Sequence, residues 1–364
     1  RPATWGCFCW LARSGGRALV RVADEGRLGP LLYQTIEGQD LVPPAVEGVL
    51  RGMRHGHALR DRFLREELVA ILDGLAAQGV DVLLLKGAAL AETVYRGAGL
   101  RPRGDLDLLV RREDAVSALD VVTALGYRPT SLEARPGADL TYENEVMLSK
   151  AGLVYFAVEV HWSLFDSPHY QQTLPMDWFW QTAQSVEIGG MPAQVLGPEA
   201  QILHLCGHLA LHHDGDEQTR LLWLHDVAEV LVHYGNQIDW PVLLSQVQAC
   251  DLVLAVQAVI GKVADGWGVQ VPGEVRERLD ALRPSPAEAR VVAWRTADER
   301  PVAQRLWSDL ASMGSWRMRL RYAWIHFFPS VAYMRQRYSI GCRLLVPLYY
   351  PYRWWVGVRS VWRY

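Results

Sequence analysis

The stretch that decides the fold is LLLKGAALAETVYRGAGLRPRGDLDLLV, residues 83–110. Its apolar start, residues 82–85, is typical of a short buried strand, and the Lys86-Gly87 turn leads into a helix predicted over residues 88–95. A glycine- and proline-rich loop follows, and residues 105–110 predict a second strand. A strand, a helix and another strand in so short a space indicate a compact α/β unit.

Two aspartates stand at the start of this second strand. Residues i and i+2 of a strand point to the same face, so Asp105 and Asp107 present two carboxylates side by side. Adjacent carboxylates repel each other unless a cation neutralises them. Mg²⁺ prefers one or two carboxylates together with phosphate oxygens and water. Asp-x-Asp is also common in turns, but here apolar residues follow directly, which favours a site that binds a nucleoside triphosphate (NTP).

The residues before these aspartates favour phosphate binding. Gly87 allows close approach of the backbone to a phosphate, and the start of the following helix supplies N–H groups and a positive dipole end. Lys86, Arg101 and Arg103 add positive charge at this point. The alternatives are an exposed lysine at a strand end and solvated loop arginines.

A later strand carries a third carboxylate. The segment VEVHW, residues 158–162, places Glu159 and His161 on one strand face in an apolar setting. If this strand pairs beside the aspartate strand, Glu159 completes a cluster of three carboxylates, and His161 either orients it or touches the substrate. A structural ion pair for Glu159 and a packed histidine remain the alternatives.

The rest of the chain divides by its periodicity. Apolar residues at spacings of three and four predict helices over residues 45–78 and 113–125, and residues 142–148 and 153–161 predict two more strands. Beyond Gly197-Pro198 the patterns are all helical, over residues 199–213, 221–234, 240–268 and 272–282. We therefore expect an N-terminal helical segment (1–60), an α/β core (61–196), a helical domain (197–300) and a basic, aromatic-rich helical region (301–364).

Histidines on the first of these helices suggest a different chemistry. His204, His208 and His212 recur on one helical face, which would fit a His-rich metallohydrolase, but the HExxH arrangement with its glutamate base is missing. A polar helix face toward a cleft is the simpler interpretation. His225-Asp226 lies in an apolar helical pattern, and Asp226 is a candidate contact for the acceptor substrate.

Composition indicates an ordinary globular protein of 364 residues with a net charge of -3, which does not single out nucleic acid as a partner. Five scattered cysteines, no signal-peptide core and no apolar run of membrane-spanning length favour a reduced, cytoplasmic protein. Residues 301–364 contain ten arginines and one acidic residue, Asp309. We expect the tryptophans of this region to fill a helical cap, with RNA or an anionic membrane surface as alternative partners.

Together these motifs resemble the DNA polymerase β-type nucleotidyltransferase superfamily, and within it the bacterial uncharacterised nucleotidyltransferase family. The resemblance covers residues 60–165 and rests on Gly87-Ala88, the Asp105/Asp107 strand and Glu159, in that order. Ala88 stands where the superfamily has a second Gly or Ser, and Glu159 where it has Asp. The resemblance implies an α+β fold, with a polymerase β-type α/β core around a small mixed sheet and a helical C-terminal domain.

It also implies an activity. An NTP would transfer its NMP group to a hydroxyl of a small molecule, a peptide or protein, or an RNA. Asp105, Asp107 and Glu159 would be the catalytic, metal-binding residues for two Mg²⁺ ions, with Mn²⁺ as the alternative ion. Lys86, Gly87, Ala88, Arg101 and Arg103 would hold the NTP, and His161 and Asp226 would lie at the acceptor site. A catalytically degenerate nucleotide- or RNA-binding or antitoxin-like module remains the alternative.

Overall fold

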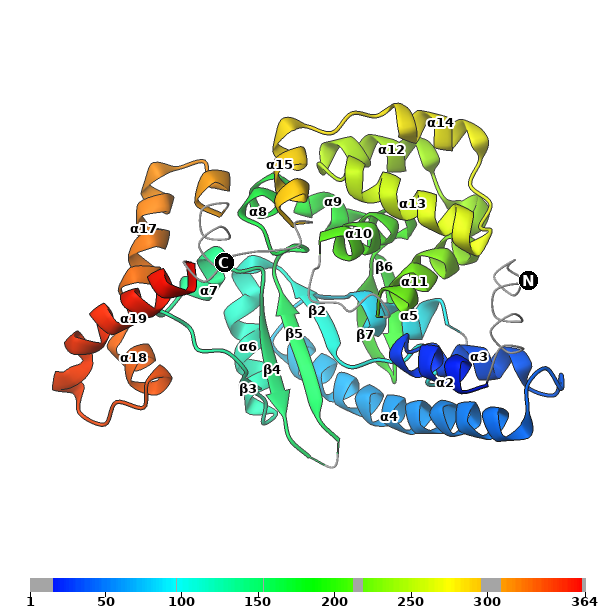
Figure 1. The fold of residues 1–364 in the computed structure, drawn as a ribbon, viewed down its shortest axis with the longest axis horizontal. Coiled ribbons are helices and arrows are strands. Elements are labelled where there is room, and N and C mark those ends of the chain that lie inside the picture. The colour runs from blue at the N-terminus through cyan, green and yellow to red at the C-terminus, as the bar shows by residue number, and fades with distance from the viewer. Residues whose placement is uncertain (1–15, 96, 153, 212–218, 296–308, 362–364) are drawn as a thin grey trace.

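A computed structural model describes residues 16–361, except residues 96, 153, 212–218 and 296–308. The chain combines a seven-stranded sheet with helices that lie on both sides of it (Figure 1). In Figure 1 the helix α4 runs below the strands, the helices α10–α15 lie above them, and the C-terminal helices project to the left. The predicted fold class, a mixed α/β core followed by a helical C-terminal region, is confirmed.

The sheet has the strand order β3-β4-β5-β2-β1-β7-β6. Its central strand β2 pairs antiparallel with β1 and parallel with β5. β4 runs antiparallel to β5, and β7 runs parallel to β1. The strands are β1 (Val82–Leu84), β2 (Leu106–Val110), β3 (Arg128–Pro129), β4 (Glu145–Lys150), β5 (Phe156–His161), β6 (Gln184–Ile188) and β7 (Met191–Val195).

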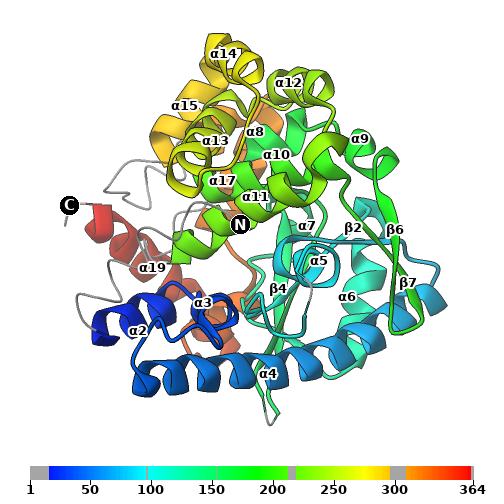
Figure 2. The same cartoon turned by 90° about the vertical axis from the view of Figure 1, so that its right-hand side faces the viewer.

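The N-terminal helices α2 (Gly16–Glu25), α3 (Gly29–Ile36) and α4 (Pro44–Ala77) close one side of the molecule. The second half of α4 lies under the sheet (Figure 2) and packs on α6 (Ala115–Ala124) and β7. Its leucines recur at helical spacing and are almost fully buried in the core that also contains the apolar side chains of β1 and β2. Burial of this face explains how so long a helix is held against the sheet.

Shorter helices connect the strands and build the upper layer. Those within the α/β part are α5 (Lys86–Thr93), α7 (Ala138–Tyr142), α8 (Pro168–Thr173) and α9 (Met176–Gln181), with the 3-10 turn η1 (Arg112–Asp114). Those of the upper layer are α10 (Pro198–Leu211), α11 (Thr219–Tyr234), α12 (Trp240–Ala249), α13 (Val253–Trp267), α14 (Gly273–Ala281) and α15 (Pro286–Arg295), with the 3-10 turn η2 (Gly235–Gln237).

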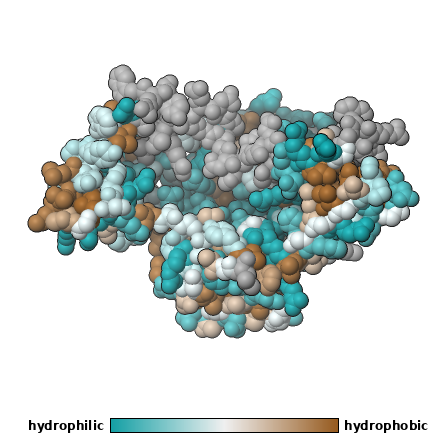
Figure 3. All heavy atoms as spheres, turned by 60° about the horizontal axis from the view of Figure 1, so that its bottom comes forward, coloured by the Kyte–Doolittle hydropathy of each residue, from teal (hydrophilic) through white to brown (hydrophobic). Residues whose placement is uncertain are grey.

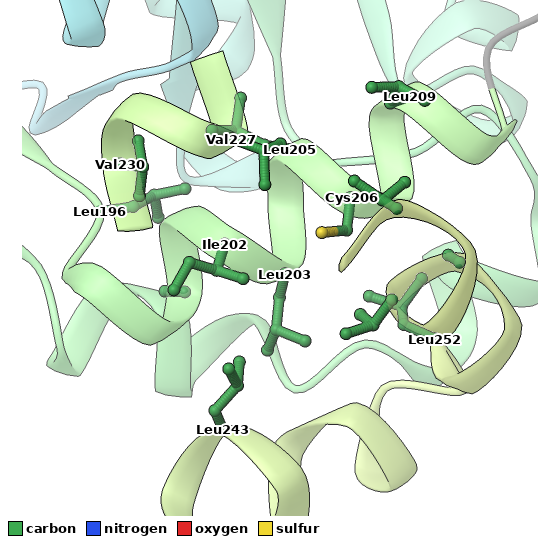
Figure 4. Packing of buried hydrophobic residues seen from close by; sticks show 14 of the residues in the cluster. Leu196, Ile202, Leu203, Leu205, Cys206, Leu209, Val227, Val230, Leu243 and Leu252 are labelled. Atoms are coloured by element: carbon green, nitrogen blue, oxygen red, sulfur yellow. The ribbon is translucent and has the colours of Figure 1, made fainter. Parts of the chain in front are cut away.

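The upper layer has its own apolar core around α10, which packs against α11, α12 and α13. Figure 4 shows this packing, with side chains from several helices meeting around α10: Leu196, Ile202, Leu203, Leu205, Cys206, Leu209, Val227, Val230, Leu243 and Leu252. The same cluster includes Leu83 and Leu109 of the sheet, so the upper layer and the sheet are packed together rather than linked loosely.

The structure adds short elements that were not predicted, β3, α7, α8, α9 and α15, and it differs from the predicted elements most clearly in two further places. The helix predicted over residues 240–268 is broken into α12 and α13, because Asp251 adopts a left-handed conformation (φ 53°) that an α-helix cannot contain. The hairpin of β6 and β7 was not predicted, although Gly189 and Gly190, both with positive φ, form its turn.

The C-terminal helices are α17 (Trp316–Phe327), α18 (Val331–Arg337) and α19 (Val346–Val361), with the 3-10 turn η3 (Arg343–Leu345) before the last. Met313, Tyr322 and Ile325 pack against Ala138 and Tyr142 of α7. This small cluster joins the C-terminal helices to the edge of the α/β part.

A buried carboxyl links α15 to α13. Glu288 is 0% exposed, and its Oε1 accepts a hydrogen bond of 2.6 Å from the Leu254 amide. Among the described residues its Oε2 has no hydrogen-bond partner. Burial raises the pKa of Glu288 to about 7, so the carboxyl keeps its proton more tightly in the folded chain than in the unfolded one.

We therefore expect a measurable pH dependence of stability. The stabilisation is fully present below the ordinary pKa of 4.5 and is lost as pH rises toward 7. In Glu288→Gln the side chain stays neutral and can still accept from Leu254, so the melting temperature should fall less between pH 5 and pH 8 than in wild type. Thermal denaturation followed by circular dichroism measures this, with exposed Glu277→Gln as control. Identical slopes for wild type and Glu288→Gln would contradict it.

Candidate active site

Three neighbouring strands bring acidic residues to one face of the sheet. In the parallel register of β2 and β5, Asp107 lies directly beside Glu159, and in the antiparallel register of β4 and β5, Glu145 lies beside His161. The alternation of side chains puts Leu106 and Leu108 on the opposite face, where both are buried. The predicted pairing of the aspartate and glutamate strands is therefore present.

Lys86 lies between the two carboxylates. It stands at the turn from β1 to α5 with a positive φ of 43°, and its Nζ is 2.7 Å from Asp107 Oδ1 and 3.2 Å from Glu159 Oε2. Burial alone would lower the pKa of Lys86, but the two carboxylates outweigh burial and raise it above its ordinary value. The ammonium is therefore charged and compensates part of the buried negative charge.

His161 is the second cation of the cluster. Its Nδ1 lies 2.8 Å from Glu145 Oε2, and its Nε2 lies 3.3 Å from Glu159 Oε2 and 3.4 Å from Asp107 Oδ1. Burial opposes the charge, but the carboxylates raise the pKa of His161 well above its ordinary value. The predicted contact between His161 and Glu159 is present, and with it a partner that the sequence did not indicate, Glu145.

The cations act in turn on the glutamates. Burial would raise the pKa of Glu159, but the His161 hydrogen bond and the Lys86 charge lower it to about 2. His161 does the same for Glu145, whose pKa is also lowered to about 2. Glu145 lies in no recognisable motif, and only the register of β4 against β5 brings it to the site. Three carboxylates thus face two cations, and the cluster keeps a net negative charge that attracts a further cation.

Asp105 lies at the edge of this cluster. It lines the same cavity, just before β2 begins, and is partly exposed. Burial and the neighbouring Asp107 raise its pKa above the ordinary value. Its carboxylate is outside the group formed by Asp107, Glu159 and His161, whose ligand atoms lie within 4.8 Å of one another.

Arg101 is buried against the turn that follows Lys86. A Cβ built on Gly87 would lie 2.4 Å from Arg101 Nη1, so glycine is required for this packing. The guanidinium pairs with Asp226 of α11 (Nη2 to Oδ2, 2.6 Å), and the Tyr95 hydroxyl donates to the same carboxylate at 2.8 Å. Asp226, the predicted acceptor contact, is 1% exposed and fully engaged in this bridge, while Ala88 is buried in the core.

Arg103 has a different environment from Arg101. Its side chain is 0% exposed, and Nε donates to Asp61 of α4 at 2.8 Å, while Nη2 lies 3.4 Å from Glu92 of α5. Asp61 also accepts from the Gly99 amide, so it ties the loop between α5 and β2 to α4. That Arg103 binds phosphate stays a prediction, because its described partners are carboxylates.

A cavity of about 1000 Å³ opens over the cluster. Its floor is the sheet face with Lys86, Asp107 and Glu159, and its opposite wall is formed by α10 and α11 with His208 and Trp223. The volume is at the upper end of that of small-molecule sites, so the cavity has room for a nucleotide and a second small molecule.

The carboxylates fit a divalent metal ion by their chemistry, because hard cations prefer carboxylate oxygens. Among the described residues, Asp107, Glu159 and His161 are the one group of three metal-binding side chain types close enough to share an ion. His204 and His208 gain no third ligand within the described ranges, and His212 lies outside them. Neither ring nitrogen of the buried His204 has a hydrogen-bond partner among these residues, and burial lowers its pKa to about 3.

The comparison with known families identifies the class of protein as a nucleotidyltransferase. The chain belongs to the family described as uncharacterised nucleotidyltransferases, whose model matches residues 15–265. No curated protein matches the chain significantly. A solved structure, an antigenic nucleotidyltransferase-like protein from Paracoccidioides brasiliensis, is similar at 13% identity and a TM-score of 0.37, covering 62% of this chain and 95% of that one. So distant a similarity carries no argument for a shared substrate.

Removing one partner of the buried pair of Arg103 and Asp61 should strongly destabilise the fold. Asp61→Ala would leave the fully buried guanidinium without its main partner, so we expect the free energy of unfolding to fall by about 3–5 kcal/mol. Chemical denaturation measures this. Glu66→Ala, which breaks the exposed pair with Arg62, is the matched control and should cost less than about 1 kcal/mol. Equal effects of the two variants would show that the buried pair has no special role.

Proposed function

We propose that this nucleotidyltransferase moves an NMP group from an NTP to a hydroxyl of an acceptor, with Mg²⁺ bound by Asp107, Glu159 and Asp105. The observation that supports this best is the convergence of Asp107 and Glu159 on one ammonium, that of Lys86, at the floor of the cavity. Carboxylates from two neighbouring strands, held on one face, are the donors that such an ion requires. Mn²⁺ has the same preference for oxygen ligands and is the alternative ion.

Two Mg²⁺ ions, when bound, would neutralise the triphosphate and make the acceptor hydroxyl more acidic. Asp107 and Glu159 are the residues that would hold them, with Asp105 at the cavity side of the pair. Glu159 is already held by Lys86 and His161, so we assign it to binding the ion rather than to moving a proton. His161 contacts the Glu159 carboxylate, and Glu145 contacts His161 in turn. Both are therefore positioning residues, which hold Glu159 in place.

The triphosphate would be bound at the start of α5. Lys86 and Gly87 line the cavity where this helix begins, so its first N–H groups and its positive dipole end are available to phosphate oxygens. Arg101 adds a guanidinium beside Gly87, and Asp226 holds that guanidinium in place. Lys86 would exchange part of its contact with the carboxylates for contact with phosphate.

The test is transfer of label from each of the four α-³²P-labelled NTPs, with Mg²⁺, into a cell extract as the source of acceptors. Asp107→Asn and Glu159→Gln should each lower transfer by about a hundredfold or more, because each removes charge that binds the ion. Asp139→Asn, which removes a carboxylate from the α7 side of the same cavity, is the matched control and should keep the activity. Chelation should abolish transfer by wild type, and added Mg²⁺ should restore it.

Two outcomes would contradict this proposal. If the wild type binds an NTP but transfers no label, the chain is a nucleotide-binding module and not a transferase. If Asp107→Asn and Glu159→Gln transfer label as well as Asp139→Asn does, the chemistry lies elsewhere in the chain.

A further inference from the structure

The outward side of α17 is apolar, although α17 is a surface helix. Trp316, Leu320, Trp324 and Phe327 follow at spacings of four, four and three residues, so they lie on one face of the helix. They are 65%, 61%, 55% and 56% exposed, respectively. The expectation that the tryptophans of this region fill a core is therefore wrong for Trp316 and Trp324, and also for Trp355, which is 55% exposed; Trp362 lies outside the described residues.

The last helix continues this feature. Leu344 in η3 is 86% exposed, and along α19 Leu348, Tyr352 and Trp355 are 69%, 51% and 55% exposed. Their spacings of four and three again place the three α19 residues on one helical face. The opposite face of α19 packs on the end of α17, where the Trp354 indole N–H donates to the Phe327 carbonyl at 2.8 Å. We call the exposed residues of both helices and η3 the C-terminal apolar face.

The exposed charged side chains of the segment that forms this face are all arginines. Residues 309–361 contain eight arginines, and their only acidic residue, Asp309, is buried and accepts a hydrogen bond from Tyr322. Arg317 and Arg359 are exposed, and their guanidinium carbons lie 5.6 Å and 5.1 Å from the ring centroids of Trp316 and Trp355, respectively. The face thus combines aliphatic side chains, indole rings and arginines, and residues 309–361 contribute no exposed carboxylate to it.

We propose that the C-terminal apolar face binds the surface of an anionic lipid membrane. Aliphatic side chains enter the boundary of the acyl chains, tryptophan and tyrosine remain at the head groups, and arginines contact lipid phosphates. Each part of the face therefore has a counterpart in such a membrane. No helix of the described residues is long and apolar enough to cross a bilayer.

Two other partners fit the face less well. RNA would use the aromatic rings and the arginines, but it would leave the exposed leucines Leu320, Leu344 and Leu348 without apolar contacts. A second copy of the chain would cover the leucines, but pairing the same face with itself brings arginines together, and residues 309–361 have no exposed carboxylate to compensate them.

The face is separate from the cavity. Figure 3 shows apolar atoms gathered at the left end of the molecule, the end at which Figure 1 places the C-terminal helices. The residues that line the cavity come from the sheet, the loops around it and the helices α5, α7, α8, α10, α11 and α15, and none belongs to α17, α18 or α19. Membrane binding would therefore localise the enzyme without using its nucleotide site.

Flotation of the full chain with lipid vesicles, in the absence of nucleotide, tests this inference. The wild type should float with vesicles of equal parts phosphatidylcholine and phosphatidylglycerol, and not with phosphatidylcholine alone. Raising the salt concentration should weaken the binding, because part of it is electrostatic. Each of Arg317→Gln and Arg359→Gln should lower the affinity by about fivefold, the effect of one arginine near an anionic surface.

Removal of the leucines separates lipid binding from simple charge attraction. Leu344→Ser/Leu348→Ser should lower vesicle binding by more than about tenfold, because these side chains would no longer enter the acyl boundary. Both residues are exposed, so the variant should keep the wild-type melting temperature. Leu59→Ser/Val232→Ser, which removes two exposed apolar residues elsewhere, is the matched control and should bind as the wild type does.

Three results would overturn the inference. The first is that the wild type does not float with the anionic vesicles. The second is that the Leu59/Val232 variant loses as much binding as the Leu344/Leu348 variant. The third is that the wild type does not bind the vesicles and the face has another partner instead. That partner would be RNA if the wild type binds poly(U), or a second copy of the chain if it forms a dimer that Leu344→Ser/Leu348→Ser dissociates. None of these readouts depends on nucleotide transfer. Failure of the membrane proposal would therefore not count against the proposed enzymatic activity.

Discussion

Two carboxylates on neighbouring parallel strands, one buried and the other largely so, repel each other strongly unless cations lie against them. In this chain the register of β2 against β5 fixes Asp107 beside Glu159, and Lys86 and His161 supply the compensating charge. The strands fix the distance between the carboxylates, so the compensating cations have to be placed against them by other parts of the chain. Lys86 is placed there by the turn after β1, and His161 lies on β5 itself.

This requirement explains several features around the cluster. Lys86 reaches the carboxylates from a residue with positive φ, a conformation that costs free energy in any residue with a side chain. Gly87 must lack a side chain because Arg101 packs across it. Arg101 and Arg103 in turn attach the loop before β2 to α11 and α4. The end of the loop that leads into the aspartates is thus attached to two different helices by buried ion pairs.

Much of this arrangement could be predicted from sequence because it depends on local patterns. The strand ending at Lys86-Gly87, the Asp105/Asp107 strand and the Glu159/His161 strand each follow from period and spacing, and the family resemblance supplied their order. Glu145 could not be predicted, because its role depends on the pairing of β4 with β5 and no spacing in the sequence encodes it. The partners of Arg101 and Arg103 are likewise remote in sequence, so both arginines looked alike before their environments were known.

The errors have equally physical reasons. The break between α12 and α13 needs one left-handed residue, Asp251, in an otherwise helical pattern, which periodicity alone does not detect. The β6–β7 hairpin did carry a signal, Gly189-Gly190 between two short alternating segments, and it could have been found. The exposed tryptophans contradict the usual burial of large apolar residues, and such exceptions are more often found at binding surfaces than elsewhere.

The bridge between Arg101 and Asp226 has a consequence for how this family can change over time. The two residues are 125 positions apart, yet each neutralises the buried charge of the other, and Tyr95 donates a hydrogen bond to the same carboxylate. Loss of either partner alone would leave the other as a buried charge without a counter-ion. Mutations at these two positions are therefore tolerated only in pairs. The helical layer and the loop before β2 are therefore expected to evolve together, and the two positions should covary among relatives of this chain.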